Sequence, residues 1–199
     1  MKVWEKKPEQ GRRKRHISLL ITGVPSTGKS TLALDWCEKN TWAYLSLNDL
    51  VEEKKLYTQI DQEDMSKIVR MRELEAEANE WIAMQDAPSI VDGHLGCEIK
   101  LDVDAVLVLR LNPKELQSRL EKRGYTPTKV DANKMAEMLD YCTIRSIKNY
   151  GEDKVFEMDM SGKSLQAELK EFEEFVKSGL HGANFRPHVS WSEELLGQA

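Results

Sequence analysis

The chain has 199 residues and a formal net charge of −5 at pH 7, and it is long enough for one α/β domain with a sizeable core. The acidic balance argues against a general nucleic-acid-binding protein, and no apolar run reaches the length of a transmembrane helix. The three cysteines, odd in number and without a C-x-x-C pair, favour a reducing compartment over a disulfide framework. We therefore expect a soluble, cytoplasmic protein with no membrane partner.

The first sixteen residues form a basic segment, with seven lysine and arginine residues against two glutamates. The densest run of positive charge, residues 12–15, comes just before the first predicted strand. Two interpretations stay open for residues 1–16. They are a flexible solvated arm and an arm that contacts RNA.

Residues 17–21 are a short apolar run that predicts the first strand, and a glycine-rich loop follows it. The loop, residues 23–30, reads GVPSTGKS and matches the phosphate-binding pattern G-x-x-x-x-G-K-[ST] in full. Residues with helical character follow from about Lys29 to Glu38. In this order of strand, loop and helix, backbone N–H groups and the helix N-terminus surround a bound phosphate. The sequence therefore predicts a nucleotide-phosphate site.

The residues of this loop have predicted tasks. Lys29 should reach the β- and γ-phosphates of ATP, and the Ser30 hydroxyl should hold Mg²⁺. The expected nucleotide-binding residues are Gly23, Pro25, Ser26, Thr27, Gly28, Lys29, Ser30 and Thr31. The alternative, a glycine-rich turn beside a surface lysine, fits the flanking strand and helix less well.

Strands and helices alternate along the rest of the chain. In order, the predicted elements are strand 41–46, helix 48–55, a polar loop at 58–62, helix 64–85, strand 89–92, strand 103–111, helix 112–123, helix 131–148, strand 155–158 and helix 164–178. This alternation predicts a parallel sheet covered on both faces, with the ligand at the carboxyl ends of the strands. The expected fold class is a three-layer α/β fold of the P-loop nucleotide kinases, with five parallel strands.

The places of the insertions favour a small nucleotide kinase. The chain is too short for a motor or a helicase, and the absence of an N-K-x-D-type guanine signature argues against a GTPase. We predict a kinase domain over residues 17–178, with a helical acceptor lobe at about 47–87 and a lid at about 123–134. Residues 179–199 form a tail whose packing the sequence leaves open.

Several segments match one known family. They are the phosphate loop at residues 21–31, the D-x-H of Asp92 and His94, the strand end at residues 108–110, the R-x-x-x-R-G-Y of residues 119–125, and Lys129, Asn133 and Glu137 behind it. Over residues 17–172 the chain thereby resembles the family of adenylate kinase isoenzyme 6, also called coilin-interacting nuclear ATPase, with archaeal and eukaryotic members.

The resemblance implies an enzyme that transfers a phosphoryl group from ATP to AMP or dAMP and also hydrolyses ATP slowly. It implies a role in maturation of the small ribosomal subunit, with a small-subunit ribosomal protein as partner. The basic arm lies outside the matching residues, and an rRNA contact through it would be consistent with that role. The location would be cytoplasmic, or nuclear in a eukaryote. A second hypothesis is an ATP-dependent ribosome assembly factor with little kinase activity. A third is a kinase for another small hydroxyl acceptor.

Four residues outside the loop are candidates for the chemistry. Asp92 ends the third predicted strand, where an acid can hold a water on Mg²⁺, although it could instead cap a helix. The resemblance places His94 in the family's ATPase motif, where it would orient a water, whereas a lone histidine is more often a filler. Arg119 and Arg123 lie one helical turn apart. Arg119 could stack on adenine and Arg123 could grip the transferred phosphate, unless both lie on a solvated face.

The acceptor lobe departs from the adenylate kinase pattern. Adenylate kinases commonly carry G-D-x-x-R after the second strand, with the arginine on the AMP phosphate, but residues 48–53 contain no arginine. Basic residues that could replace it are Lys54, Lys55, Arg70 and Arg72. Arg145, in the helix after the lid, is a further candidate for a phosphate clamp. The spacing does not choose among them.

Three further residues are interpreted as structural rather than reactive. Met135 and Cys142 fall on apolar helix faces and are interpreted as core residues. Cys97 follows Gly96 in the loop after the D-x-H, and a reactive thiol is the less favoured interpretation there.

Overall fold

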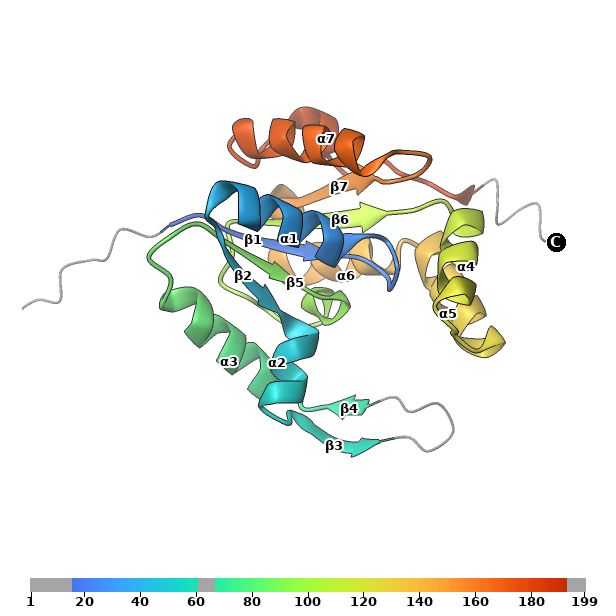
Figure 1. Ribbon diagram of the computed structural model, residues 1–199, viewed down its shortest axis with the longest axis horizontal. Coiled ribbons are helices and arrows are strands. Elements are labelled where there is room, and N and C mark those ends of the chain that lie inside the picture. The colour runs from blue at the N-terminus through green and yellow to red at the C-terminus, as the bar shows by residue number, and fades with distance from the viewer. Residues whose placement is uncertain (1–15, 61–66, 193–199) are drawn as a thin grey trace, which may run out of the picture.

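The computed structural model describes residues 16–60 and 67–192. Its centre is a five-stranded sheet in which every pair of neighbouring strands is parallel (Figure 1). In spatial order the strands are β2 (Ala43–Ser46), β5 (Ser89–Asp92), β1 (Ser18–Thr22), β6 (Ala105–Arg110) and β7 (Val155–Asp159). The predicted α/β fold with five parallel strands is confirmed.

Helices cover both faces of this sheet. Figure 1 shows α1 (Lys29–Asn40) in front of the strands, α7 (Leu165–Lys177) above β7 and α6 (Tyr141–Tyr150) behind the strands. On the front face, the ring of Trp36 in α1 packs edge-on against Phe172 in α7, with 5.1 Å between centroids. Burying each such large apolar side chain stabilises the fold by about 1.5–3 kcal/mol. The two helices therefore form one layer.

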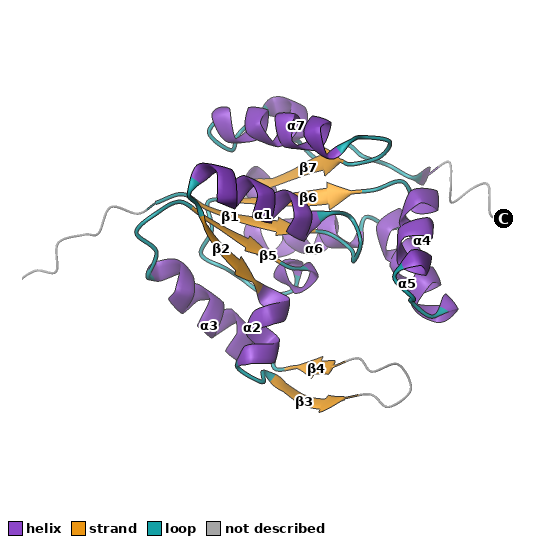
Figure 2. Cartoon of the chain, in the orientation of Figure 1, coloured by secondary structure: helices purple, strands orange, loops and turns teal. Residues whose placement is uncertain are grey.

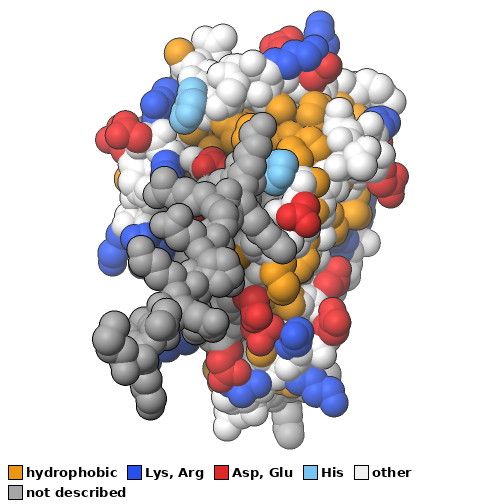
Figure 3. Space-filling model, turned by 90° about the vertical axis from the view of Figure 1, so that its left-hand side faces the viewer, with side chains coloured by type: hydrophobic (Ala, Val, Ile, Leu, Met, Phe, Trp, Pro, Cys, Tyr) orange, Lys and Arg blue, Asp and Glu red, His pale blue; other side chains and the backbone are white. Residues whose placement is uncertain are grey.

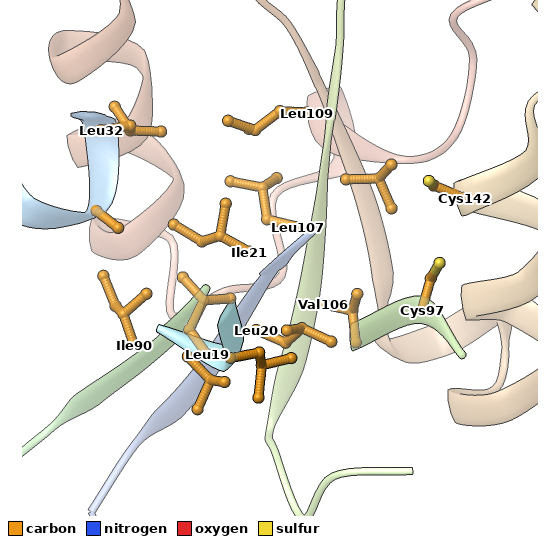
Figure 4. Packing of buried hydrophobic residues seen from close by; sticks show 14 of the residues in the cluster. Leu19, Leu20, Ile21, Leu32, Ile90, Cys97, Val106, Leu107, Leu109 and Cys142 are labelled. Carbon is orange, nitrogen blue, oxygen red and sulfur yellow. The ribbon is translucent and has the colours of Figure 1, made fainter. Parts of the chain in front are cut away.

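The core lies on both sides of β1 and β6. Both strands are buried along their whole length, as expected for a parallel sheet between two helical layers. Figure 4 shows Leu32 of α1 on one side of these strands and the sulfurs of Cys97 and Cys142 on the other. Cys142 is buried as predicted, but Met135, also predicted to be core, is 45% exposed.

The acceptor lobe is not wholly helical, which corrects the prediction. The predicted helix 64–85 begins only at Met71, in α3 (Met71–Ala83), and the predicted polar loop before it is partly strand. Figure 2 shows a hairpin instead, in which β3 (Tyr57–Ile60) pairs antiparallel with β4 (Lys67–Val69) beyond α2 (Leu47–Glu53). The prediction also covered Asp64 and Met65, which lie outside the described residues.

The hairpin forms because local side chains favour extended backbone at this point. Ile68 and Val69 are β-branched residues. Their side chains have few allowed rotamers and therefore fit a strand better than a helix. The Lys67 ammonium lies 4.4 Å from the centre of the Tyr57 ring across the hairpin, a cation–π contact. Helical spacing of apolar residues therefore misled the prediction, because a short strand can share that spacing by chance.

The lid region contains two helices where the sequence predicted one helix at 131–148. After α4 (Pro113–Lys122), which is close to its prediction, come α5 (Pro127–Met138) and then α6. Thr126 begins α5 early, since its hydroxyl accepts a hydrogen bond from the Lys129 N–H at 3.4 Å and Pro127 suits the first turn. Asp140 then interrupts the helix with a left-handed φ of 53°.

A buried ion-pair cluster fixes the base of α5 to the sheet. Arg110, at the end of β6, is 1% exposed and contacts three carboxylates, those of Glu137, Asp140 and Glu157. The indole N–H of Trp191 donates to Glu137 at 3.0 Å, so the tail also packs on the body here. Removing one partner from a buried ion pair costs about 3–5 kcal/mol, and we infer that this cluster holds α5 against the sheet.

The structure describes only part of each terminal segment. The basic arm lies outside the described residues except for His16, and so do residues 193–199 of the tail. None of the helices in the described ranges combines the length and hydrophobicity that a bilayer crossing requires. Figure 3 shows the end of the molecule where the strands begin, with charged side chains of both signs around an apolar area.

Candidate nucleotide-binding site

The candidate site lies at the opposite end, where the sheet strands finish. The phosphate loop joins β1 to α1, and Asp92 is the last residue of the neighbouring strand β5. Figure 1 shows α4 and α5 at this end of the sheet. A parallel sheet brings its strand ends together at one edge, and so the sequence-distant candidates meet here.

The two glycines of the loop are required by its shape. Gly23 has a φ of 136°, and a Cβ there would lie 2.5 Å from the carbonyl oxygen of Leu109. Gly28 has a φ of 105° at the start of α1, again a conformation that other residues rarely adopt. Ser26 is also left-handed, and its buried hydroxyl has no hydrogen-bond partner among the described residues. A buried hydroxyl of this kind suits a polar ligand.

Lys29 is the first residue of α1 and is buried, with 8% of its surface exposed. Its ammonium donates a hydrogen bond to the carbonyl oxygen of Val24 at 2.8 Å, across the loop. Burial lowers the pKa of Lys29, while the nearby Asp92 acts in the opposite direction. The alternative of a surface lysine beside a turn is therefore wrong. A buried cation held by one carbonyl can exchange that partner for a phosphate.

Ser30 and Asp92 form a pair beside Lys29. The Ser30 hydroxyl donates to Asp92 Oδ2 at 2.5 Å, and the Tyr44 hydroxyl donates to the same oxygen at 3.0 Å. Asp92 is 3% exposed, and its other oxygen, Oδ1, has no hydrogen-bond partner in the described part of the chain. A buried carboxylate oxygen without a partner, next to a hydroxyl, is a donor set that fits Mg²⁺. Asp92 does not cap the following 3₁₀ helix, whose N-cap is Gly93.

Sequence reasoning missed Tyr44, which lies on β2 next to β5. Strand pairing places Ser46 opposite Asp92, so Tyr44 reaches the acid from two positions earlier. Burial and the negative charge of Asp92 both raise the pKa of Tyr44. The phenol therefore stays a hydrogen-bond donor to the carboxylate at neutral pH. The only signal in the sequence was an aromatic residue in a strand, which is typical of many strands.

His94 begins the 3₁₀ helix η1 (His94–Cys97) and is half-buried. Burial, helped by the positive charge of Lys29, lowers the pKa of His94 to about 4. The imidazole is thus neutral near pH 7, with one nitrogen able to accept a hydrogen bond.

Two cavities meet at this edge of the sheet. The first, which we name the phosphate-loop cavity, has a volume of about 140 Å³ and is lined by Pro25, Ser26, Gly28, Lys29, Ser30, Thr31, Asn48, Asp92, Gly93, His94, Arg123 and Tyr125. The second cavity has a volume of about 610 Å³ and is lined by Val24, Pro25, Met71, His94, Leu95, Cys97, Glu98, Asn133, Ala136, Tyr141, Cys142 and Arg145. Pro25 and His94 line both, so the cavities adjoin at these residues.

The two lid arginines both lie near the loop. Arg123, at the end of α4, lines the phosphate-loop cavity. Arg119, one turn earlier, lies beside the loop, since a Cβ added to Gly28 would be 3.9 Å from its Nη1 atom. Arg119 also lies 3.8 Å from Glu115, a distance that leaves its guanidinium loosely held.

Among the acceptor candidates, only Arg145 lines the second cavity. Its Nε and Nη2 atoms donate to one oxygen of Glu98, at 3.0 and 2.5 Å. Tyr141 donates to the other oxygen of Glu98. The four candidates near the hairpin, Lys54, Lys55, Arg70 and Arg72, line neither cavity, and two of them pair with glutamates of α3. The structure thus brings one candidate cation to the second cavity and leaves the others at the lobe surface.

The sequence is similar to known proteins over most of its length. Residues 19–140 match the family described as "AAA domain". A protein of Methanosarcina acetivorans named "Putative adenylate kinase" is 34% identical over 167 residues, which cover 81% of this chain and 87% of the relative. A protein of Methanocaldococcus jannaschii with the same name is 32% identical over 180 residues, covering 90% of this chain and 96% of the relative.

Solved structures share the fold at low sequence identity. A thymidylate kinase from Candida albicans superposes with a TM-score of 0.56 at 15% identity, covering 84% of this chain and 93% of that one. A gluconokinase from Sinorhizobium meliloti gives a TM-score of 0.53 at 16% identity, covering 94% of this chain and 99% of that one. At such identities the likeness concerns the fold alone.

Proposed function

The chain belongs to the family of these archaeal adenylate kinase relatives, and from that premise we propose that it transfers a phosphoryl group from ATP to AMP or dAMP. The observation that carries the proposal is the junction of the two cavities at Pro25 and His94. A phosphoryl group in the polar cavity faces an acceptor in the larger one. When water takes the place of the acceptor, the same site hydrolyses ATP slowly.

On the donor side, the phosphate loop supplies the charges. In this proposal Lys29 leaves the Val24 carbonyl and contacts the phosphates of ATP, while the N-terminus of α1 adds its partial positive charge. Ser30 and Asp92 are the residues that would hold Mg²⁺, and Tyr44 fixes the Asp92 carboxylate. Mg²⁺ held by these two residues would supply charge neutralisation at the phosphate oxygens. Phosphoryl transfer needs little from the protein beyond such positioned charges.

On the acceptor side, the second cavity has the size and lining of a small-molecule site. Its volume of about 610 Å³ lies in the range usual for ligand pockets. Met71, Leu95 and Ala136 offer apolar surface to a base, and Arg145 offers a cation to the acceptor phosphate. The Arg145–Glu98 pair is partly exposed, so solvent weakens it and a phosphate can replace Glu98 as the partner of Arg145.

The lid residues act on the transferred group. Arg123 lines the phosphate-loop cavity, where its guanidinium can stabilise charge that develops during transfer. Arg119 lies beside Gly28 and can stack its plane on the adenine of ATP. His94, neutral at the junction, can accept a hydrogen bond from an attacking water and thereby orient it for hydrolysis.

The proposal is tested by measuring ADP and inorganic phosphate formed from ATP and Mg²⁺, with and without AMP. If the protein is a kinase, ADP formation requires AMP, and little inorganic phosphate is released. Lys29→Ala is the inactive comparison, and Lys39→Ala is its matched control, because Lys39 lies on the same helix but is exposed and paired with Asp35. Phosphate release that does not depend on AMP, without AMP-dependent ADP, would contradict the kinase and favour an ATPase.

The assembly-factor hypothesis rests on the family resemblance and stays a prediction. It includes a small-subunit ribosomal protein as partner, rRNA contacts through residues 1–16, and the cytoplasmic or nuclear location. Pull-down of small-subunit ribosomal proteins in ATP and in ADP tests it directly. Retention that changes with the nucleotide would support an assembly factor, and equal or absent retention would count against it.

A further inference from the structure

Two thiols from different elements meet at the wall of the second cavity. Cys97 is the last residue of η1, and Cys142 lies in the first turn of α6. Figure 4 shows the two side chains on the same side of β1 and β6, with the Cys97 sulfur pointing toward Cys142, and the two thiols are close enough to shift each other's pKa. The Cys97 thiol also donates a hydrogen bond to the His94 carbonyl oxygen at 3.2 Å. The two residues are 2% and 6% exposed, and both line the cavity. A small molecule in this cavity therefore reaches a pair of adjacent thiols.

The surrounding structure holds the two cysteines together. The Asn149 side chain of α6 donates to the carbonyl oxygen of Cys97 at 2.8 Å, and the Tyr150 hydroxyl donates to that of Gly96 at 2.8 Å. These bonds tie η1 to α6 next to the thiols and so keep the two cysteines at one relative position.

The third cysteine provides an internal contrast. Cys37 is buried in α1, where its thiol contacts the Ala43 carbonyl oxygen at 3.7 Å, and burial raises its pKa to about 11. The neighbouring Cys142 thiol instead lowers the pKa of Cys97. A thiolate is the reactive form of cysteine, so Cys97 is the first of the three to react.

We propose that Cys97 and Cys142 form a reversible disulfide when the protein reacts with a peroxide, and that this disulfide lowers the AMP-dependent activity of the second cavity. The Cys97 thiolate attacks one oxygen of hydrogen peroxide, so that an S–O bond forms and the O–O bond breaks, releasing one water after protonation. The Cys142 sulfur then attacks the Cys97 sulfur, the S–S bond forms, and the S–O bond breaks to release a second water. Both sulfurs are oxidised and the peroxide is reduced. A dithiol reverses the reaction.

The functional consequence rests on the proposed acceptor role of the second cavity. The disulfide joins η1, which carries His94, to α6, which carries Arg145, and so fixes two walls of the cavity relative to each other. Neither cysteine lines the phosphate-loop cavity. We expect AMP-dependent transfer to fall about tenfold, since a displacement below 1 Å can cost that much, while ATP binding persists.

The first part of the test reads the bond itself. The full chain is treated with hydrogen peroxide, blocked with iodoacetamide, and examined by intact mass and peptide mapping. The expected result is a loss of two hydrogen atoms and a peptide pair linked through Cys97 and Cys142. Cys37→Ser should still form the link, whereas Cys142→Ser should not. A Cys37→Ser protein in which both thiols stay free, or in which Cys97 is oxidised only to acids, overturns the proposal.

The second part measures activity before and after oxidation. The oxidised protein should lose AMP-dependent transfer about tenfold, as expected for a shift of catalytic geometry, and recover it with dithiothreitol. A disulfide that leaves this rate unchanged overturns its control of the acceptor cavity. If the reduced protein shows no AMP-dependent transfer, the proposed function fails, and the mass measurement still decides on the disulfide independently.

Discussion

The phosphate-loop cavity and the second cavity adjoin at Pro25 and His94, but they are built in opposite ways. One continuous segment, residues 23–31, supplies much of the first cavity, and it is polar. The second draws its walls from the phosphate loop, the start of α3, η1, α5 and α6, and much of it is apolar. A phosphate site can thus be encoded locally, because backbone N–H groups do the binding, whereas a pocket for an acceptor is assembled by the whole fold.

The largest expected effect tests whether both activities depend on the phosphate-loop cavity. Lys29→Ala removes its buried cation, so both AMP-dependent transfer and hydrolysis should fall by about 10²–10³-fold, the loss typical of a preorganised charge. Initial rates at saturating ATP measure this effect, with Lys39→Ala as the control that should keep wild-type rates. Equal rates for the two variants would remove Lys29 from the chemistry.

A smaller effect is expected at the junction of the cavities. His94→Gly removes the neutral imidazole that can orient a water, so hydrolysis without AMP should fall by about 10²-fold. ATP binding, measured by calorimetry, should change little, because the loop residues and Lys29 remain. His16→Gly is the control, since His16 precedes β1 at the other end of the sheet. A full hydrolysis rate in the His94 variant would show that this residue has no part in hydrolysis.

The smallest of these effects tests whether Tyr44 positions Asp92, one of the two proposed Mg²⁺ ligands. Tyr44→Phe keeps the ring but removes the hydrogen bond to Asp92. A hydrogen bond to a charged group stabilises a protein by about 1.5–3 kcal/mol, and we take the lower value here. We expect the rate at limiting Mg²⁺ to fall by about tenfold, with partial recovery at high Mg²⁺. Tyr57→Phe in the hairpin should have no effect. A Mg²⁺ dependence equal to that of the wild type would mean that Tyr44 does not position the carboxylate.

The same contrast explains how far the sequence predicted the structure. The sheet, the phosphate loop and the place of Asp92 follow from local patterns, namely apolar runs and one glycine motif, and the structure has them where expected. The hairpin was missed because Ile68 and Val69 fit a helical spacing as well as a strand. The helix break at Asp140 was missed because a non-glycine residue rarely takes a left-handed φ.

The walls of the second cavity could not be predicted for a different reason. The pair of Glu98 and Arg145, and the pair of Cys97 and Cys142, each join residues more than forty positions apart. No spacing in one sequence specifies such contacts, because they depend on how α6 packs against η1. Arg145 could therefore be suggested as a clamp from its place after the lid, but only the fold distinguishes it from Arg72 and the other basic residues.

The most direct test of the two-cavity arrangement is the affinity of AMP for Arg145→Ala, measured by calorimetry beside Arg72→Ala and the wild type. Arg145 lines the second cavity, whereas Arg72 does not. Losing a charged hydrogen-bond partner should weaken AMP binding by about 10–10²-fold in Arg145→Ala. ATP binding should be unchanged, and Arg72→Ala should bind AMP as the wild type does. Wild-type AMP affinity in Arg145→Ala, or an equal loss in Arg72→Ala, would contradict the assignment of the second cavity to the acceptor.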